Sequence, residues 1–304
     1  MQELFDRRVL LITGKGGVGR STLTAALAHA AHKRGKRVLV AEIGQADSDY
    51  TPLARLFGRD TFPKDPIPLS GGVRGVTLWP RKGHERFFKK VIPVSALVNA
   101  ALSSHALQRM LDAAPSFNEM GVFYHLLTLL LEQRPDGKYE HELIIVDMPA
   151  SGHTLGLTGV PSRVLEAMPS GPIAQAMREG QEVMHDPKQC AVWVVALPEL
   201  LPVTEALELL DGLVKDKMPI GGVLLNRFVP DEFTPEERER LQPLLEEREV
   251  YGKARFIGSP RSEEALERLD RGSKVRVLRI TERPLQGKAL AASIAEDFAS
   301  GRTA

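Results

Sequence analysis

Residues 13–22 read TGKGGVGRST, and this stretch directly follows the apolar run RVLLIT at 8–13. A glycine-rich loop between a buried strand and a helix favours phosphate binding, because the loop amides and the helix N-terminus both attract an anion. The P-loop pattern G-x-x-x-x-G-K-[ST] requires a lysine at position 20. This chain has Arg20 there, and its lysine stands early in the loop, at Lys15. The stretch therefore predicts a phosphate site and leaves open whether a nucleotide is hydrolysed there.

Each part of the loop has a predicted role. The backbone amides of Gly16 to Ser21 can wrap a phosphate chain at the start of the helix. The Ser21 hydroxyl is expected to bind Mg²⁺, and Thr22 is expected to lie near the α-phosphate. The complete set of predicted phosphate-binding residues is Gly14, Gly16, Gly17, Val18, Gly19, Arg20, Ser21 and Thr22.

A second candidate segment is IIVDMPASGHT at 144–154. Its first half is a buried-type strand, and Asp147 stands at the carboxyl end of that strand. Carboxyl ends of parallel strands meet at one edge of a sheet, so Asp147 is expected beside the glycine loop as a ligand of Mg²⁺, directly or through water. Taken alone, such an aspartate is also typical of a helix or turn cap. Beside a P-loop, the metal interpretation is favoured.

Apolar runs of strand length alternate with helical patterns along the whole chain, which predicts a mostly parallel α/β sheet with helices on both faces, of the P-loop NTPase type. Residues 1–304 are expected to form a single domain. The stretch from about 84 to 133 is predicted to be a helical insertion. Strands are predicted at 8–13, 37–43, 76–80, 142–149, 191–198, 220–226 and 254–260, and helices at 20–34, 118–133 and 284–299.

Composition excludes several classes of protein. The chain has 40 Lys+Arg against 39 Asp+Glu, so its formal charge of +1 gives no field that would attract nucleic acid. The single cysteine, Cys190, excludes a disulfide framework or a cysteine-rich metal site within one chain and is expected in the core. The longest apolar stretch, 120–131, is too short to span a membrane. With no signal peptide visible, a cytoplasmic protein without stable membrane insertion is expected.

In combination, these motifs resemble one family. GKGGVG matches the deviant Walker A loop, and DMPASGHT matches a D-x-P-x-[TS]-G-H-T segment that follows a strand. Both are found in the ATPases of arsenite efflux and of tail-anchored-protein targeting (the ArsA/GET type). The helical insertion, VLLNRF at 223–228 and PRSEEALERL at 260–269 extend the similarity over most of the chain.

The resemblance implies ATP and Mg²⁺ as ligands, and it implies roles for particular residues. Lys15 is the signature lysine that reaches across a dimer interface to the partner's phosphates, so Lys15 and Arg20 are the predicted catalytic residues. Ser21 and Asp147 form the metal site. Asn226 hydrogen-bonds the adenine and Pro260 helps to close the base pocket. Without the resemblance, Asn226 is equally well read as a turn residue.

Two departures from the family bear on turnover. Arg20 keeps the positive charge, but its planar fork on a longer side chain does not replace a compact ammonium at a tight site. In the switch that follows the second strand, the family carries an aspartate in D-P-x-H, and this chain has Gly44. Glu42 and Asp47 are close in sequence, but Glu42 lies within the strand and Asp47 comes three residues late. Binding is therefore expected, whereas turnover stays open, and a slow or inactive ATPase is one of the alternatives.

The predicted function is an ATP-binding, nucleotide-switched ATPase that forms a homodimer, or a heterodimer with a paralogue that has an intact loop. The alternative is a non-hydrolysing regulatory or scaffold subunit. A membrane-surface partitioning protein is not favoured, because the C-terminal tail is short and weakly basic. One cysteine does not suffice for arsenite. The apolar residues of the helical insertion either pack in the core or form a groove for an apolar client helix: Val94, Leu97, Val98, Phe123, Leu126, Leu127, Leu130 and Leu131.

Overall fold

The computed structural model describes residues 2–44, 51–91, 115–167, 169–247, 250 and 252–302. Its centre is an eight-stranded sheet in the order β3-β4-β2-β5-β1-β6-β7-β8. Every neighbouring pair is parallel except β3 with β4. The strands are β1 (Val9–Gly14), β2 (Val38–Ile43), β3 (Ile67–Pro68), β4 (Arg74–Leu78), β5 (Leu143–Ala150), β6 (Cys190–Ala196), β7 (Ile220–Phe228) and β8 (Val277–Thr281).

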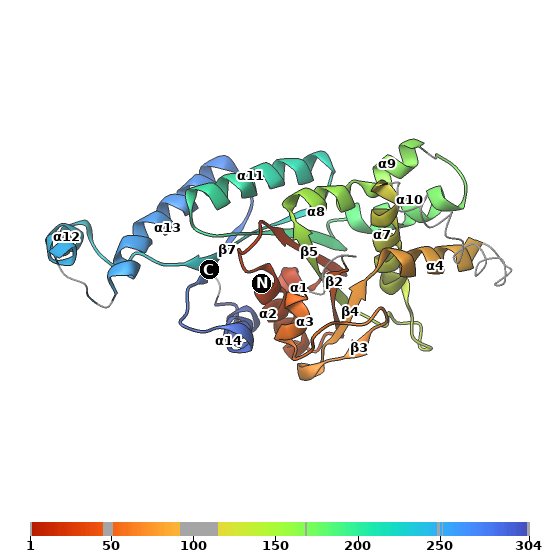
Figure 1. Ribbon diagram of the computed structural model, residues 1–304, viewed down its shortest axis with the longest axis horizontal. Helices are drawn as coiled ribbons and strands as arrows, with labels where there is room; N and C mark the ends of the chain where they lie inside the picture. The colour runs from red at the N-terminus through yellow and green to blue at the C-terminus, as the bar shows by residue number, and fades with distance from the viewer. Residues whose placement is uncertain are drawn as a thin grey trace.

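Helices cover both faces of this sheet, as Figure 1 shows, and the predicted α/β fold is confirmed. One face carries α1 (Gln2–Phe5), α2 (Arg20–Lys33), α3 (Pro52–Leu56) and α14 (Gly287–Ser300). The other carries α4 (Pro80–Val91), α7 (Pro115–Leu131), α8 (Ser151–Thr158), α9 (Val160–Ala167), α10 (Pro172–His185), α11 (Leu200–Lys215) and α13 (Lys253–Gly272). A 3-10 turn spans Ser70–Gly72, and α12 (Pro235–Glu247) lies at one end of the molecule, away from the sheet.

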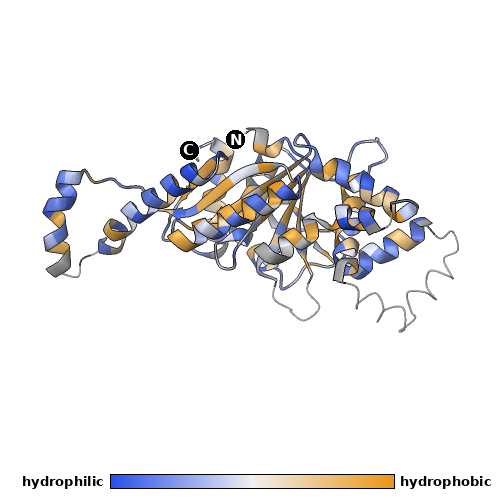
Figure 2. Cartoon of the chain, turned by 90° about the horizontal axis from the view of Figure 1, so that it is seen from above, coloured by the Kyte–Doolittle hydropathy of each residue, from blue (hydrophilic) through white to orange (hydrophobic). Residues whose placement is uncertain are grey.

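The central strands are buried on both faces, which explains their continuous apolar sequences. Every residue of β1 is buried, and this strand lies between β5 and β6 in the middle of the sheet. Successive side chains point to opposite faces. Leu10 and Ile12 therefore pack under α2, while Val9 and Leu11 pack on the other side. Figure 2 shows the hydrophobic residues concentrated in these layers, whereas α12 is largely hydrophilic. The glycine loop thus leaves the centre of the sheet at its carboxyl edge.

The predicted strand at 254–260 is wrong, because this segment opens helix α13. Of its apolar residues Phe256 is buried and Ile257 is 44% exposed, so burial follows one helical face and not a whole strand. The edge strand β8 at Val277–Thr281 was not predicted. Its buried positions, Leu278 and Ile280, alternate with exposed ones, and such a short half-buried pattern is a weak signal.

The predicted helical insertion begins earlier than expected, with α4 at Pro80, and continues in the described chain as α7. Val94, Leu97 and Val98 lie outside the described residues. Of the apolar residues of α7 that were proposed for the insertion, four are 4% exposed or less and lie in the core beside the sheet, whereas Leu131 is 45% exposed. The buried ones are Phe123, Leu126, Leu127 and Leu130. As folded here, these four pack as core and are not open to a client.

Cys190 opens β6 and is fully buried, which agrees with the prediction of a core residue. Burial raises the pKa of its thiol well above the ordinary value. Among the helices of the described residues, none combines the length and apolarity that a membrane span requires.

Candidate functional site

The loop between β1 and α2 has the backbone of a phosphate cradle. Gly14, Gly17 and Gly19 have φ values of 147°, 81° and 96°, which side-chain-bearing residues rarely adopt. A side chain at Gly14 would also run into the carbonyl of Val195 on β6. The middle of the loop is exposed, and the first amides of a helix have no partner within the helix. The loop is therefore exposed and glycine-rich at the start of α2, where the first helix amides lack partners within the helix.

Ser21 and Asp147 meet at the mouth of this loop. The Ser21 hydroxyl donates a hydrogen bond of 2.5 Å to Oδ2 of Asp147. The second carboxylate oxygen, Oδ1, is buried and has no partner. Burial raises the pKa of Asp147 to about 6, although the Ser21 hydrogen bond and the charge of Arg20 favour the ionised form. The structure therefore brings Ser21 and Asp147 together, as predicted, and leaves Oδ1 of Asp147 without a hydrogen-bond partner.

This donor set fits magnesium better than a softer metal, because it consists of a hydroxyl and a carboxylate oxygen. Among the residues that the structure describes, no group of three or more His, Cys, Asp or Glu could hold a metal by protein ligands alone. Magnesium usually keeps several waters and takes phosphate oxygens as its other ligands. Ser21 and Asp147 therefore fit an ion that arrives with a nucleotide.

Arg20 does not extend into the loop. Its Nη1 donates a hydrogen bond to the carbonyl of Met148, the residue after Asp147 on β5. Burial lowers the pKa of Arg20, and the nearby charge of Asp147 opposes that shift. The guanidinium is thus held at the end of β5 through Nη1, which leaves its remaining N–H donors for other contacts.

Lys15 lies over α11 and forms an ion pair of 3.0 Å with Glu205. The Lys15 side chain is 50% exposed, and ion pairs at such exposure contribute only about 0–1 kcal/mol. The pair can therefore open at little cost. Glu205 was not singled out from the sequence, since nothing in its local pattern distinguishes it from the other acidic residues of α11.

A second link joins the loop to the segment after Asp147. The hydroxyls of Thr13 and Thr154 are 2.7 Å apart, and the Thr154 hydroxyl also donates to the carbonyl of Pro149 at 2.9 Å. Both threonines are fully buried. The end of β1 and the start of α8 are therefore fixed to each other. The sequence motif DMPASGHT includes Thr154, but it did not predict the contact with Thr13.

Asn226 and Pro260 are on different elements, β7 and α13. Asn226 ends the buried part of β7, and its Nδ2 donates a 2.8 Å hydrogen bond to the carbonyl of Val18 in the glycine loop. Pro260 is an exposed residue inside α13. Their chain neighbours, Arg227 and Arg261, line one cavity of about 930 Å³ between α11, α13 and the end of β7.

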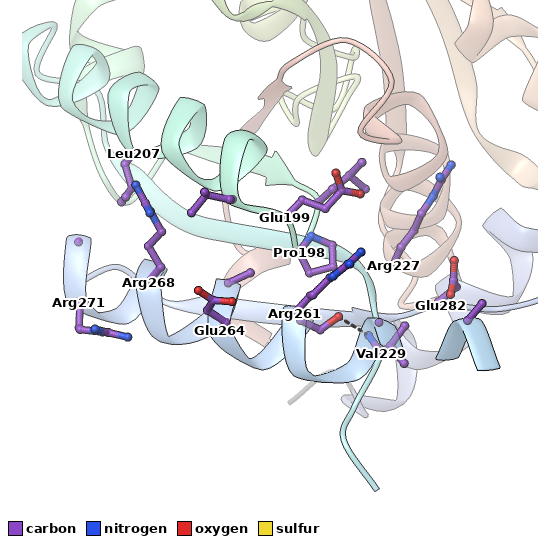
Figure 3. A pocket seen from close by; sticks show the side chains of 17 residues that line it. Pro198, Glu199, Leu207, Arg227, Val229, Arg261, Glu264, Arg268, Arg271 and Glu282 are labelled. Atoms are coloured by element: carbon purple, nitrogen blue, oxygen red, sulfur yellow. Dashed lines mark hydrogen bonds between the residues drawn. The ribbon is translucent and has the colours of Figure 1, made fainter. Parts of the chain in front are cut away.

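Figure 3 shows this cavity with Arg227 and Arg261 at one end and Arg268 at the other, facing Leu207 of α11. Arg227 has a φ of 57°, in a region that non-glycine residues rarely occupy. It stands where the pairing of β7 with β8 shifts register, between Asn226 and Phe228. The cavity therefore begins directly beside the residue that contacts the glycine loop.

Gly44 follows the end of β2, and its surroundings explain why it is a glycine. A Cβ atom at this position would come within 2.7 Å of the Trp79 ring. Trp79 precedes α4, and its backbone N–H donates to Nδ1 of His125 on α7 at 3.2 Å. The space in which the expected aspartate would begin is therefore filled. Gln45 and Asp47 lie outside the described residues.

Glu42 lies on β2 beside Asp147 of β5, at the same level of the sheet. It is 6% exposed, and its Oε1 accepts a hydrogen bond of 3.3 Å from the Thr77 hydroxyl. Burial raises the pKa of Glu42 to about 7; the Thr77 hydrogen bond opposes this shift, and the charge of Asp147 adds to it. The site thus contains a second buried acid that the sequence motif does not include.

Comparison with known proteins agrees with this geometry. The family model described as anion-transporting ATPase matches residues 7–174 of the 304. ATPase BagA of Mycobacterium tuberculosis is 27% identical over 237 residues, which are 76% of this chain and 68% of that protein. The arsenical pump-driving ATPase of Acidiphilium multivorum is 25% identical over 236 residues, 71% of this chain and 39% of that protein. This chain therefore spans about two fifths of the length of that pump protein.

Proposed function

Since this chain belongs to the anion-transporting ATPase family, we propose that it binds ATP with Mg²⁺ and works as a nucleotide-switched ATPase that pairs with a second subunit. The observation that carries the proposal is the contact between Ser21 and Asp147 at the mouth of the glycine loop. It joins a hydroxyl and a carboxylate from distant parts of the chain beside free helix-terminal amides. A magnesium–nucleotide complex needs these groups in this arrangement.

In this mechanism the amides from Gly16 onward hold the phosphates, and Ser21 and Asp147 hold the metal ion with its waters. When bound, Mg²⁺ neutralises charge on the phosphate oxygens. The hydroxyl link between Thr13 and Thr154 passes a change at the phosphates on to α8. The cavity that starts at Arg227 would offer the nucleoside polar contacts from its arginine side chains and apolar contacts from Pro198.

The test of nucleotide binding is calorimetry with ATP and Mg²⁺ on the full chain. Wild type should bind, and Asp147→Asn should lose most of the magnesium dependence of that binding, because the amide removes the charge beside Ser21. Asp270→Asn, an exposed aspartate on α13, is the matched control and should behave as wild type. Absence of binding by wild type at millimolar ATP would refute the proposal.

A non-hydrolysing subunit is the second candidate, and two observations favour it. Arg20 is held by the Met148 carbonyl, and the Trp79 ring fills the space beside Gly44. Steady-state turnover separates the candidates. If Arg20 is the limiting residue, Arg20→Lys should raise kcat with a smaller effect on ATP affinity, because a lysine supplies a compact point charge in place of the planar guanidinium. If neither protein has measurable turnover while both bind ATP, the non-hydrolysing candidate is favoured.

Pairing is proposed through Lys15, whose exposed ammonium adds little to its own loop but can reach the phosphates of a facing subunit. Its ion pair with Glu205 would have to open, and a charge-assisted bond to phosphate, worth roughly 1.5–3 kcal/mol, outweighs that pair. Light scattering with a non-hydrolysable ATP analogue should show a mass increase, for the chain alone or mixed with a paralogue that has an intact loop. Lys15→Ala should abolish the increase, and an equal increase in the variant would contradict the role.

A further inference from the structure

The position of Glu42 suggests a role in the site described above. Glu42 on β2 and Asp147 on β5 are paired in the register of two neighbouring parallel strands. Neighbouring strands lie about 4.8 Å apart, and side chains at the same level point to the same face. Val40 and Ile145, two residues earlier on each strand, pack in the core under α2. Both carboxyl groups therefore face the side of the sheet on which Ser21 lies.

Both acids are buried, and each keeps an oxygen without a partner. The exposed fractions of Glu42 and Asp147 are 6% and 9%. No hydrogen bond of good geometry reaches Glu42 Oε2 or Asp147 Oδ1, which are both buried, although the backbones of Ala54 and Phe62 lie close enough to Glu42 to oppose the effect of burial, which raises its pKa. The other oxygen of each accepts a hydrogen bond, from Thr77 and from Ser21 respectively. A buried carboxylate oxygen without a donor is costly unless a ligand completes it. Two such oxygens in one row beside a phosphate loop indicate a shared ligand.

Position 44, where the family has an aspartate, cannot supply a second acid, because the Trp79 ring occupies the space in which a side chain of residue 44 would begin. Glu42, two residues earlier on β2, points to the same face as position 44, and its side chain lies beside Thr77. The hydroxyl of Thr77, its register partner on β4, donates to the Phe62 carbonyl at 2.9 Å and makes a longer contact of 3.3 Å with one oxygen of Glu42. A longer acid placed deeper in the same strand can therefore reach the region that the missing aspartate would have served.

We propose that Glu42 is a positioning residue of the magnesium–nucleotide site, where it binds a water of the ion's coordination shell together with Asp147. This inference rests on the proposed function. The donor set is oxygen only, and waters held by outer carboxylates are the usual environment of Mg²⁺. Glu42 would thus take over part of the role that Gly44 cannot have.

Manganese binding tests the inference without using turnover. Electron paramagnetic resonance measures free Mn²⁺ during titration of the full chain with a non-hydrolysable ATP analogue present. Glu42→Gln keeps the shape and the Thr77 bond but removes the charge, and it should weaken Mn²⁺ binding by about 10-fold or more, as outer partners of metal ligands do. Glu239→Gln, exposed on α12, is the matched control and should leave the affinity unchanged.

The alternative is that Glu42 only supports the local packing around Thr77 and α3. In that case Glu42→Gln would change the unfolding temperature and leave Mn²⁺ affinity at the wild-type value, and the inference would be overturned. If Glu42→Gln does not fold, Glu42→Asp is measured in its place and should retain part of the Mn²⁺ affinity. Full wild-type affinity in Glu42→Asp would contradict a defined position of the Glu42 carboxylate in the metal site. Failure of wild type to bind the analogue at all would instead refute the proposed function.

Discussion

The ring of Trp79 determines what residue 44 can be. Gly44→Asp should destabilise the protein by about 1–3 kcal/mol, because the new side chain starts within 2.7 Å of that ring. Urea unfolding measures the loss. The double variant with Trp79→Leu should recover part of it relative to Trp79→Leu alone, since the smaller side chain leaves room. If Gly44→Asp costs as much in the Trp79→Leu background as in wild type, the ring is not the obstacle.

At the residue scale, contacts between residues of the sequence motifs could be predicted, whereas contacts that arise from packing between elements could not. The contact of Ser21 with Asp147 follows from two strand ends at one sheet edge, and motif spacing is enough to find it. The bond from Arg20 to Met148, the pair of Lys15 with Glu205 and the cover of Trp79 over Gly44 depend on side-chain directions across elements. No local pattern carries that information, so these contacts could not be predicted.

Helices α4 and α7 cross unusually closely because glycine is present on both. A Cβ atom at Gly83 would overlap the carbonyl of Gly121, and one at Gly121 would overlap the carbonyl of Pro80. Gly121→Ala should therefore cost about 1–3 kcal/mol, even though alanine is the better helix former by up to about 1 kcal/mol. Thermal or urea unfolding measures the difference.

The matched control is Gly156→Ala on α8, where a Cβ atom meets nothing within 4 Å. This variant should be neutral or slightly stabilising, as expected for a helical glycine with free space. Equal losses in the two variants would mean that close packing of α4 on α7 is not the cause.

At the level of elements, the buried strands were found and the elements with one-sided burial were harder to assign. β1, β2 and β5 are continuous apolar runs because helices cover both of their faces. The opening of α13 contains a similar short run, yet its exposed Ile257 and buried Phe256 belong to a helix. Periodicity cannot separate these cases over seven residues, and only the tertiary partners decide.

At the scale of the whole molecule, His125 should make a contribution to stability that is lost on mild acidification. Burial lowers the pKa of His125 from 6.5 to about 4; Arg86 and Lys82 lower it further, while Asp65 and the Trp79 hydrogen bond oppose them. In the unfolded chain His125 is therefore protonated below about pH 6.5, whereas in the folded chain it is protonated only below about pH 4. The neutral His125 therefore contributes fully to the free energy of unfolding above pH 6.5. This contribution, up to about 3 kcal/mol, is lost as the pH falls towards 4.

Denaturant unfolding at several pH values tests this pH dependence with the variant His125→Gln. At pH 7 the variant should be less stable, because it loses buried packing. The difference from wild type should narrow between pH 6.5 and 4, since glutamine takes up no proton. Glu42 and Asp147 act in the opposite direction, because their raised pKa values let the folded state bind protons first, and both proteins share that effect. A difference that does not change with pH would contradict the contribution of His125.

The fully buried thiol of Cys190 makes this chain a ready background for site-specific chemical labelling. A thiol reagent must reach the sulfur and reacts with its thiolate form. In the native fold Cys190 is buried, and burial keeps its thiol protonated. Native protein should therefore remain unmodified by Ellman's reagent, and one equivalent should react on unfolding. A cysteine introduced at an exposed site such as Asp270 on α13 would then take a fluorophore or spin label by itself, with no need to remove the native cysteine. The separation of two subunits could be followed directly in this way.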